Sequence, residues 1–261
     1  MLGRTLVWAG ITALTALLSR WLSNALHSYP HTRAPGPSAA CHPAAARDEQ
    51  RLADFPLWPL IEALLVERAL KPFKLRPTFK PLRILNLDHG PGGIVVALRR
   101  RAALDSTIVA ADSVAGMDDL ARHRAARRGA ARPIHFLQSW TQGLPFHDHT
   151  FDLVITSGGL HSWPYPEQTL AEIARVLTPD GRYLVADFRR DLSLWQWLLV
   201  RLVQALFVPK DLRALGEPAV SIGAAYSRHE AEWLAARAKL PDLGVTRGPA
   251  WVMLERALER T

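Results

Sequence analysis

The chain has almost no cysteine. Cys41 is the only one among its 261 residues, so no disulfide can form within the chain. Charged residues are also sparse, at 21%, against 49% hydrophobic residues. That balance excludes an intrinsically disordered chain and is typical of a packed globular protein. The fold must therefore be stabilised by a hydrophobic core and not by covalent cross-links.

The sequence also lacks a cluster of His, Cys, Asp and Glu with metal-ligand spacing. His147 and His149 flank Asp148, but no further ligands accompany them. We interpret these three as solvated residues of a polar turn. No metal ion is expected.

Acidic residues are outnumbered: 24 Asp and Glu stand against 32 Lys and Arg, which gives a formal net charge of +8. The excess is mostly arginine and lies in residues 99–101 and again in residues 122–132. Two interpretations stay open. The arginines either form the solvated faces of two helices or form a surface that binds a polyanion such as nucleic acid.

The sequence divides into three parts. Residues 1–26 hold an uncharged apolar run, Thr5–Leu18, between Arg4 and Arg20. A membrane-crossing helix needs about 20 apolar residues, so this hydrophobic helix is open to interpretation as a membrane anchor, an interfacial helix, a secretory signal or a packed helix. Residues 27–50 are rich in Pro, Ala, Ser and His and are predicted to form a flexible linker. Residues 51–261 are predicted to form the globular domain.

Within the globular domain, short apolar runs alternate with helical patterns. An amphipathic helix over residues 54–70 opens the domain as a lid helix within residues 51–80, and prolines at 72, 77 and 81 are expected to end it. Strands are expected at residues 83–87, 107–111, 134–137, 152–156, 182–186 and 245–254, and helices at 93–101, 116–127, 166–177 and 229–239. This alternation predicts an α/β fold with a Rossmann-like, doubly wound, mostly parallel sheet.

The first of these strands runs into a glycine-rich turn, Asp88-His89-Gly90-Pro91-Gly92-Gly93. Such a turn lets backbone approach a ligand closely and aims helix N–H groups at its negative end. Asp112 ends the second strand, 20 residues after Gly92. An acid at that spacing is placed to accept hydrogen bonds from ribose hydroxyls. A nicotinamide cofactor needs the same arrangement, so the spacing alone does not choose the cofactor.

Three stretches carry a family resemblance: ILNLDHGPGG, then VAADSVAGMDDLAR, then LPFHDHTFDLVITSGGLHSWPYPEQTLAEIARVLTPDGRYLVADFRRD. Together they resemble the small-molecule class I S-adenosylmethionine-dependent methyltransferases, in the type 11 group that includes the ubiquinone and menaquinone C-methyltransferases. The resemblance covers about residues 82–190 and is most specific in the third stretch. It implies an enzyme, S-adenosyl-L-methionine as cofactor, and an antiparallel strand at the C-terminal end of the sheet.

The resemblance also implies a role for each matching position. Gly90 and Gly92 would line the loop under the methionine part of the cofactor. Asp112, with Ser113 beside it, would hold the ribose, and Met117 would lie near the adenine. The remaining implied positions are Ser157 and Gly158 at the methyl-transfer site, with His161 close by, and Phe188 at the start of the substrate wall.

Three positions depart from the family pattern. The family usually has an acid where Asn86 stands, a glycine where Asp88 stands, and, near the adenine amino group, an acid where Trp140 stands. All three are retained as expected cofactor-binding residues. Asp tolerates a positive φ better than most residues, although the Asp88 carboxylate could crowd the carboxylate of the cofactor. Trp140 would either stack on the adenine or be a core residue of a protein that no longer binds the cofactor.

Methyl transfer from a sulfonium is an in-line displacement, so the protein mainly aligns the acceptor with the methyl group and excludes water. An acidic acceptor would be helped by a base. His161 is the first candidate for that base and Asp187 the second. The alternative for His161 is a loop histidine that only shapes the site.

The acceptor is expected to be small and lipophilic. The segment 192–209, inside an expected substrate-cap insertion over residues 189–228, is strongly apolar and has two tryptophans. Burial against the sheet, or docking on a bilayer beside the N-terminal helix, would explain it equally. Tyr226 and Arg228 are expected near the acceptor.

Two other classes of function stay open. A degenerate methyltransferase fold could act as a non-catalytic binding or scaffold protein. A nucleic-acid methyltransferase is disfavoured, because Thr156-Ser157-Gly158-Gly159 stands where an Asn-Pro-Pro-Tyr-type motif is expected after the fourth strand. A cytoplasmic catalytic domain is expected, with membrane association through the N-terminal helix as the alternative. The oligomeric state is not predicted.

Overall fold

The structure, a computed structural model, describes residues 2–30, 32–34, 58–75, 80–103, 105–129, 133–208, 210–214 and 216–257. In these residues the centre of the molecule is a seven-stranded sheet with the strand order β3-β2-β1-β4-β5-β7-β6. The strands are β1 (Arg83–Leu87), β2 (Thr107–Asp112), β3 (His135–Gln138), β4 (Phe151–Ser157), β5 (Leu177–Phe188), β6 (Leu243–Arg247) and β7 (Trp251–Arg256).

The sheet is doubly wound. Strands β1 to β5 are parallel, whereas β7 runs antiparallel to both β5 and β6. From β1 the chain moves outward to β2 and β3, and then returns to add β4 and β5 on the other side of β1. The winding direction therefore reverses between β1 and β4, and in such sheets ligands bind beyond the carboxyl ends of the strands at that reversal.

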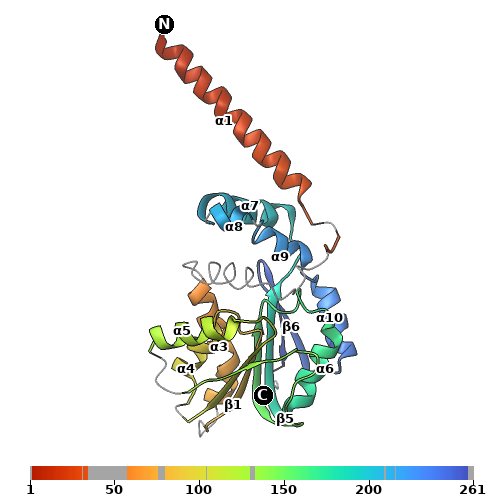
Figure 1. The fold of residues 1–261 in the computed structure, drawn as a ribbon. Helices are drawn as coiled ribbons and strands as arrows, with labels where there is room; N and C mark the ends of the chain where they lie inside the picture. Colours follow the sequence, from red (N-terminus) through yellow and green to blue (C-terminus); the bar gives the residue numbers. More distant parts are fainter. Residues whose placement is uncertain are drawn as a thin grey trace.

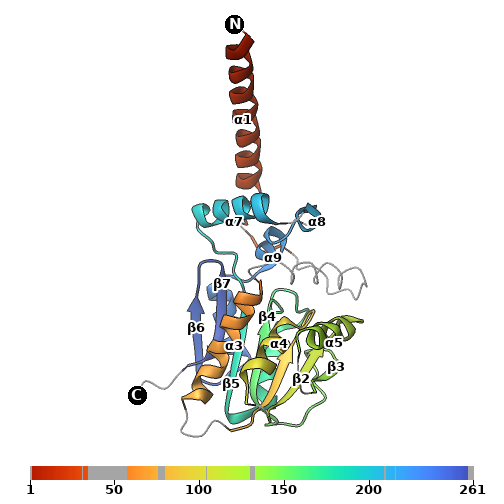
Figure 2. The ribbon, with the colours of Figure 1, turned by 90° about the vertical axis from the view of Figure 1, so that its left-hand side faces the viewer.

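Helices cover both faces of the sheet (Figures 1 and 2). One face carries α3 (Trp58–Lys74), α4 (Gly93–Arg101) and α5 (Met117–Arg127), and the other carries α6 (Pro166–Val176) and α10 (Arg228–Arg237). Because both faces are covered, the central strands are apolar on both sides and show no polar alternation. Ile84, Leu85 and Leu87 of β1 are all fully buried.

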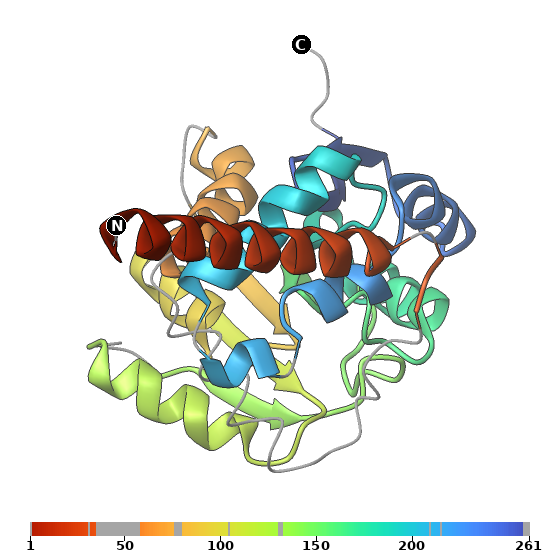
Figure 3. The same cartoon turned by 90° about the horizontal axis from the view of Figure 1, so that it is seen from above.

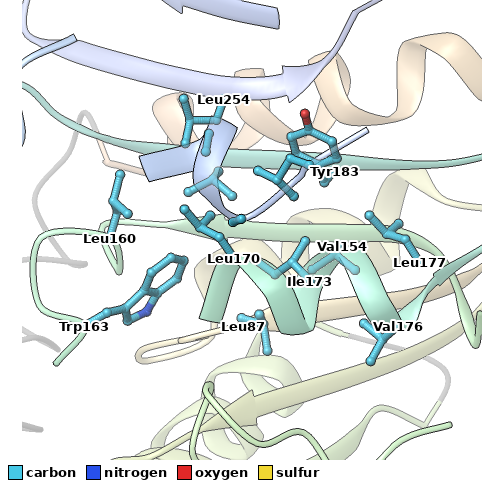
Figure 4. Packing of buried hydrophobic residues seen from close by; sticks show 14 of the residues in the cluster. Leu87, Val154, Leu160, Trp163, Leu170, Ile173, Val176, Leu177, Tyr183 and Leu254 are labelled. Atoms are coloured by element: carbon cyan, nitrogen blue, oxygen red, sulfur yellow. The ribbon is translucent and has the colours of Figure 1, made fainter. Parts of the chain in front are cut away.

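Two hydrophobic cores hold these layers together. On the α6 and α10 face, Val154, Tyr183 and Leu254 from the sheet pack against Leu170 and Ile173 of α6 (Figure 4). On the other face, the sheet packs against apolar residues of α3 and α4. Burial of each large aliphatic side chain contributes about 1.5–3 kcal/mol, so the cores supply the stability that a chain with one cysteine requires.

Three helices follow β5 and lie beyond the carboxyl ends of the parallel strands: α7 (Leu194–Phe207), α8 (Lys210–Ala214) and α9 (Ala219–Ala224) (Figures 1 and 2). The N-terminal helix α1 (Leu2–His27) runs outward from this end of the molecule and, seen from above, crosses over it (Figure 3). Its junction with the body is specific: the buried indole Nε1 of Trp197 in α7 donates to the carbonyl of Ala25 at 2.7 Å.

The described helices do not bear out the membrane anchor. None of them, α1 included, combines the length and the apolar character that a membrane crossing needs. The chain after α1 also differs from the expected linker in its first residues. The Tyr29 hydroxyl donates to the Leu192 carbonyl, and Ala34 N donates to Gly223 O at 3.0 Å. The rest of the expected linker, 35–50, lies outside the described residues.

The expected α/β fold is confirmed, with three local differences. The opening helix continues through Pro72 to Lys74, because a proline in the last turn removes only one helical hydrogen bond. The strand expected at residues 245–254 is a hairpin of two strands, β6 and β7, since Gly248 N donates to Trp251 O at 2.9 Å and closes a turn. The third difference is the presence of helices α8 and α9, which the sequence does not predict because these segments show no apolar periodicity.

Candidate functional site

The candidate site lies at the carboxyl ends of β1, β2, β4 and β5, where the winding of the sheet reverses. The glycine-rich turn after β1 forms its floor. Gly90 and Gly92 have φ of 51° and 87°, in the left-handed region that favours glycine. A Cβ on Gly92 would lie 2.8 Å from the Cβ of Ala121, so only glycine lets the turn pack this closely on α5.

Asp112 lies beside this turn, as its spacing from Gly92 predicts. One oxygen of its buried carboxylate accepts from Gly90 N at 3.0 Å, and the other accepts from Val114 N at 2.9 Å. Each carboxylate oxygen has a second lone pair, so Asp112 is able to accept two further hydrogen bonds. Burial, only partly offset by His89 and the two N–H donors, raises its pKa. Ser113 follows it directly, half-buried at the end of β2.

The two residues expected near the adenine follow β2 and β3. Met117 is fully buried at the first turn of α5. Trp140, in the loop after β3, is 53% exposed. This exposure excludes the interpretation of Trp140 as a core residue and leaves its ring free to stack on a planar ligand.

Asn86 is fully buried next to the end of β1. Its Nδ2 donates to the carbonyls of Leu87 and Ile155, at 3.2 and 3.0 Å. Its Oδ1 is buried without a hydrogen-bond partner among the described residues. Nearly all buried polar atoms in proteins are paired, so an unpaired acceptor here fits a ligand that brings an N–H donor. The Thr156 hydroxyl oxygen, at the end of the adjacent β4, is buried and unpaired in the same way.

Asp88 connects the turn to the loop after β4. It has a φ of 46°, and its carboxylate accepts a hydrogen bond from the indole Nε1 of Trp163. A Cβ on Gly159 would overlap this carboxylate. Burial raises the pKa of Asp88 to about 7, and the negative charge of Asp112 adds to the shift. A glycine at 159 is therefore needed to make room for the acid at 88.

His161 and Asp187 form a buried pair across the ends of β4 and β5. His161 Nδ1 lies 2.8 Å from Asp187 Oδ1, and the backbone N–H of His161 donates to Oδ2 at 2.7 Å. The backbone N–H of Phe188 donates to the same carboxylate at 2.6 Å. Burial lowers the pKa of His161, but its interactions with Asp187 outweigh that effect and the net shift is upward. Ser157, half-buried, ends β4 four residues before the histidine.

Aromatic residues lie near His161. The ring of Phe188 lies 6.4 Å from the imidazole and 6.4 Å from the ring of Trp58, which begins α3. The guanidinium of Arg33 lies 4.0 Å from the ring centre of Tyr226 and donates to the His161 carbonyl at 3.3 Å. Helix α3, the end of β5, the loop before α10 and the segment after α1 therefore contribute to this part of the site.

The other polar clusters singled out in the sequence have structural partners. Asp148 pairs with Arg175 at 2.7 Å, and His149 Nδ1 lies 2.9 Å from the Leu177 carbonyl. Arg99 is buried and donates to the Ser106 carbonyl at 2.9 Å. Arg100 donates to the Arg128 carbonyl, so these arginines bond within the protein. The described residues contain no group of three or more metal-ligating side chains.

Sequence reasoning missed three contributors to the site. Trp163 is hydrogen-bonded to Asp88, and Arg33 lies in a stretch predicted to be a linker. Trp58 lies inside the expected lid helix but was not singled out as a site residue. Only Trp163 had a usable signal, because it follows His161 by two residues in the most family-like stretch. The other two come from segments distant in sequence.

Comparison with known proteins agrees with this geometry. Residues 85–185 match the model of a methyltransferase domain. The ubiquinone/menaquinone biosynthesis C-methyltransferase UbiE of Xanthomonas oryzae pv. oryzae is 33% identical over 162 residues, which cover 58% of this chain and 64% of that protein. UbiE of Xylella fastidiosa strain M12 is 34% identical over 113 residues, covering 43% of this chain and 45% of the relative. The chain thus spans less than two thirds of the length of these relatives.

Solved structures share the fold. A putative S-adenosyl-L-methionine-dependent methyltransferase from Methanococcus maripaludis superposes with a TM-score of 0.60 at 17% identity, covering 81% of this chain and 91% of that one. A SAM-dependent methyltransferase from Aquifex aeolicus gives 0.56 at 19% identity, covering 80% and 96%. Residues 85–185 therefore match the methyltransferase-domain family, and the sheet order and the glycine turn are those that the resemblance to class I S-adenosylmethionine-dependent methyltransferases implies.

Proposed function

We propose that this chain transfers a methyl group from S-adenosylmethionine to a small, apolar, aromatic acceptor, with His161 as the base. The observation that carries the proposal is the buried His161–Asp187 pair, which stands beside the glycine turn and Asp112 at the reversal of the sheet. In this position the pair would bring a proton acceptor next to the proposed cofactor site, which supports the proposal.

The residues present fit the cofactor. Asp112 has lone pairs left for two ribose hydroxyls, and the left-handed turn brings backbone close to a ligand. The unpaired Oδ1 of Asn86 would accept an N–H from the ligand, and the exposed ring of Trp140 would stack on the adenine. When bound, S-adenosylmethionine supplies a methyl group on a sulfonium that is displaced in line by the acceptor atom.

His161 would remove the acceptor's proton as the new bond forms. Its Nδ1 faces Asp187, so the ring is held with Nδ1 as the donor and Nε2 as the acceptor. Among the described residues, no hydrogen bond occupies Nε2. Asp187 acts as a positioning residue, because it fixes both the imidazole and the backbone of His161. Burial of the pair keeps water from competing for the methyl group.

The surroundings of His161 support an apolar, aromatic acceptor. Phe188, Trp58 and Tyr226 supply rings near it, and rings favour stacked or edge-on contact with a planar substrate. The relatives take their names from ubiquinone and menaquinone biosynthesis, so hydroquinones and phenols are the first acceptors to test. The internal bonding of Arg99 and Arg100 argues against a polyanion-binding face.

The test has two steps. Calorimetric titration of the full chain with S-adenosylmethionine and S-adenosylhomocysteine should show binding of both. Mass spectrometry should then detect methyl transfer to a hydroquinone or phenol, lost in His161→Ala and retained in His147→Ala, whose histidine is exposed in the turn before β4. A folded protein that binds neither ligand would overturn the proposal and favour a non-catalytic scaffold, which the substitutions at Asn86 and Asp88 would then explain.

A further inference from the structure

Three carboxylates converge at the candidate site: Asp88 from the turn after β1, Asp112 from β2 and Asp187 from β5. Asp112 and Asp187 are well compensated. Asp112 accepts two backbone N–H groups, and Asp187 accepts from two backbone N–H groups and faces an imidazole. In the described part of the chain, Asp88 accepts a single hydrogen bond, from the neutral indole of Trp163. Asp88 is thus the acid whose negative charge is stabilised by the fewest hydrogen bonds.

The surroundings of Asp88 are also unfavourable for a negative charge. Besides burial, the charged groups that face it are Asp112, Asp187 and His161, and two of these three are acids. Their joint effect brings the pKa of Asp88 to about 7. The carboxyl group is therefore held near its midpoint at neutral pH, and a cation placed against it would draw it into the ionised form.

Asp88 occupies this position at a cost in local structure. Its φ of 46° is one that few residues other than glycine adopt, and Gly159 must lack a side chain to admit the carboxylate. The indole of Trp163 in turn fixes its orientation between the glycine turn and the loop that carries His161. The carboxylate therefore interacts both with Asp112, beside the cofactor floor, and with His161, the proposed base.

We propose that Asp88 is the counter-ion of the cofactor's sulfonium, so that the site binds the cationic methyl donor in preference to its neutral thioether product and releases a proton as it does so. The inference rests on the proposed function. S-adenosylmethionine and S-adenosylhomocysteine share the ammonium, the carboxylate, the ribose and the adenine, and they differ in the sulfonium methyl group. A carboxylate at the sulfur therefore discriminates between them by charge.

Isothermal titration calorimetry of the full chain tests this without any acceptor. At pH 6.5, titrations in two buffers of different ionisation enthalpy should show proton release with S-adenosylmethionine and less with S-adenosylhomocysteine. Affinity for the methyl donor should rise as pH increases from 6 to about 7.5, because Asp88 becomes ionised. Asp88→Asn should lower the preference for donor over product by at least about tenfold and should remove the proton release.

His161 is present in both proteins, so the difference between them reports on Asp88 and on its interaction with His161. If Asp88→Asn fails to fold, Asp88→Gly, which suits the positive φ, takes its place. An unchanged preference in the folded variant would overturn the inference and leave the proposed function intact. Failure of the wild-type chain to bind either ligand would instead overturn the proposed function.

Discussion

At the scale of single residues, the Asp112 carboxylate accepts backbone hydrogen bonds and also keeps lone pairs for a ligand. It holds the glycine turn through Gly90 N and the start of the following loop through Val114 N, and its remaining lone pairs face the site. Because hydrogen bonds to a charged group contribute about 1.5–3 kcal/mol, the carboxylate should matter more for ligand binding than an acid on the surface does.

We expect Asp112→Ala to weaken S-adenosylmethionine binding by roughly 10- to 100-fold, measured by calorimetry. Asp119→Ala is the matched control, since Asp119 is exposed on α5 nearby, and its affinity should stay within about twofold of wild type. Circular dichroism would verify that both variants fold. Equal affinities in the two variants would contradict the placement of the ribose beside Asp112.

His161 gives a second prediction at this scale, for the pH dependence of the rate. The carboxylate of Asp187 raises the pKa of His161 above the usual 6.5, and only the neutral imidazole can take a proton. The rate at saturating donor should therefore rise with pH through a value above 6.5. Asp187→Asn should move that rise to lower pH, because burial without the acid favours the neutral ring. An unchanged pH–rate profile would show that Asp187 does not raise the pKa of the base.

At the scale of elements, the turn between β1 and α4 depends on close packing against α5. Gly92 and Gly116 both have φ above 80°, at 87° and 81°, but a Cβ on Gly116 would meet nothing within 4 Å. Both alanine variants share the left-handed penalty of about 1–2 kcal/mol. Only Gly92→Ala adds the overlap with Ala121.

Gly92→Ala should therefore be less stable than Gly116→Ala by about 1–3 kcal/mol, as measured by urea unfolding. Since the overlap would push the turn away from α5, cofactor affinity should fall in the first variant alone. Equal stabilities would show that α5 moves freely enough to admit the methyl group.

The junction of α1 with α7 is the second element-level feature. Trp197 is 1% exposed and its indole donates to Ala25 O, whereas Trp195 on the same helix is 66% exposed. Trp197→Phe should lower the free energy of unfolding by about 1 kcal/mol or more, because the hydrogen bond is lost and the ring is smaller. Trypsin should then cleave after Arg20 faster than in wild type, and Trp195→Phe should change neither quantity. Equal cleavage rates would mean that the Ala25 contact does not hold α1.

At the scale of the whole molecule, a buried acid links stability to pH. Glu62 of α3 is 7% exposed, and a Cβ on Gly93 would overlap its carboxylate. Burial raises its pKa from 4.5 to about 7, against the lowering effect of Arg124 and Arg128. Between these two values the folded chain keeps a proton that the unfolded chain has lost. The contribution of Glu62 to the free energy of unfolding therefore falls as pH rises through that window.

The slope contributed by Glu62 is at most about 1.4 kcal/mol per pH unit. Glu62→Gln should remove it, so the variant should gain stability relative to wild type as pH is raised from 5 to 7.5, measured by urea unfolding at each pH. Glu67→Gln is the control on the same helix, because Glu67 lies on the surface, in an ion pair with Lys74. A difference in unfolding free energy between Glu62→Gln and wild type that does not change with pH would show that folding does not raise the pKa of Glu62.

The fold, and the glycine turn with its nearby acid, could be predicted from the sequence. Strand positions, the glycine turn and the acid 20 residues later are local patterns, and a parallel sheet necessarily brings the carboxyl ends of its strands to one edge. The placement of Gly90, Gly92 and Asp112 could therefore be inferred from spacing, and the third family-like stretch singled out His161 and Asp187.

The surroundings of these residues could not be predicted, because they depend on the packing of the folded chain. The bond between Asp88 and Trp163 joins residues 75 apart, and the contacts of Arg33 with His161 and of Trp197 with Ala25 join residues 128 and 172 apart. No periodicity or spacing encodes such pairs, because they depend on how whole elements pack. The ionisation of buried acids also depends on the folded structure. Burial and neighbouring acids set the pKa of Asp88 and Glu62, and both exist only once the chain has folded.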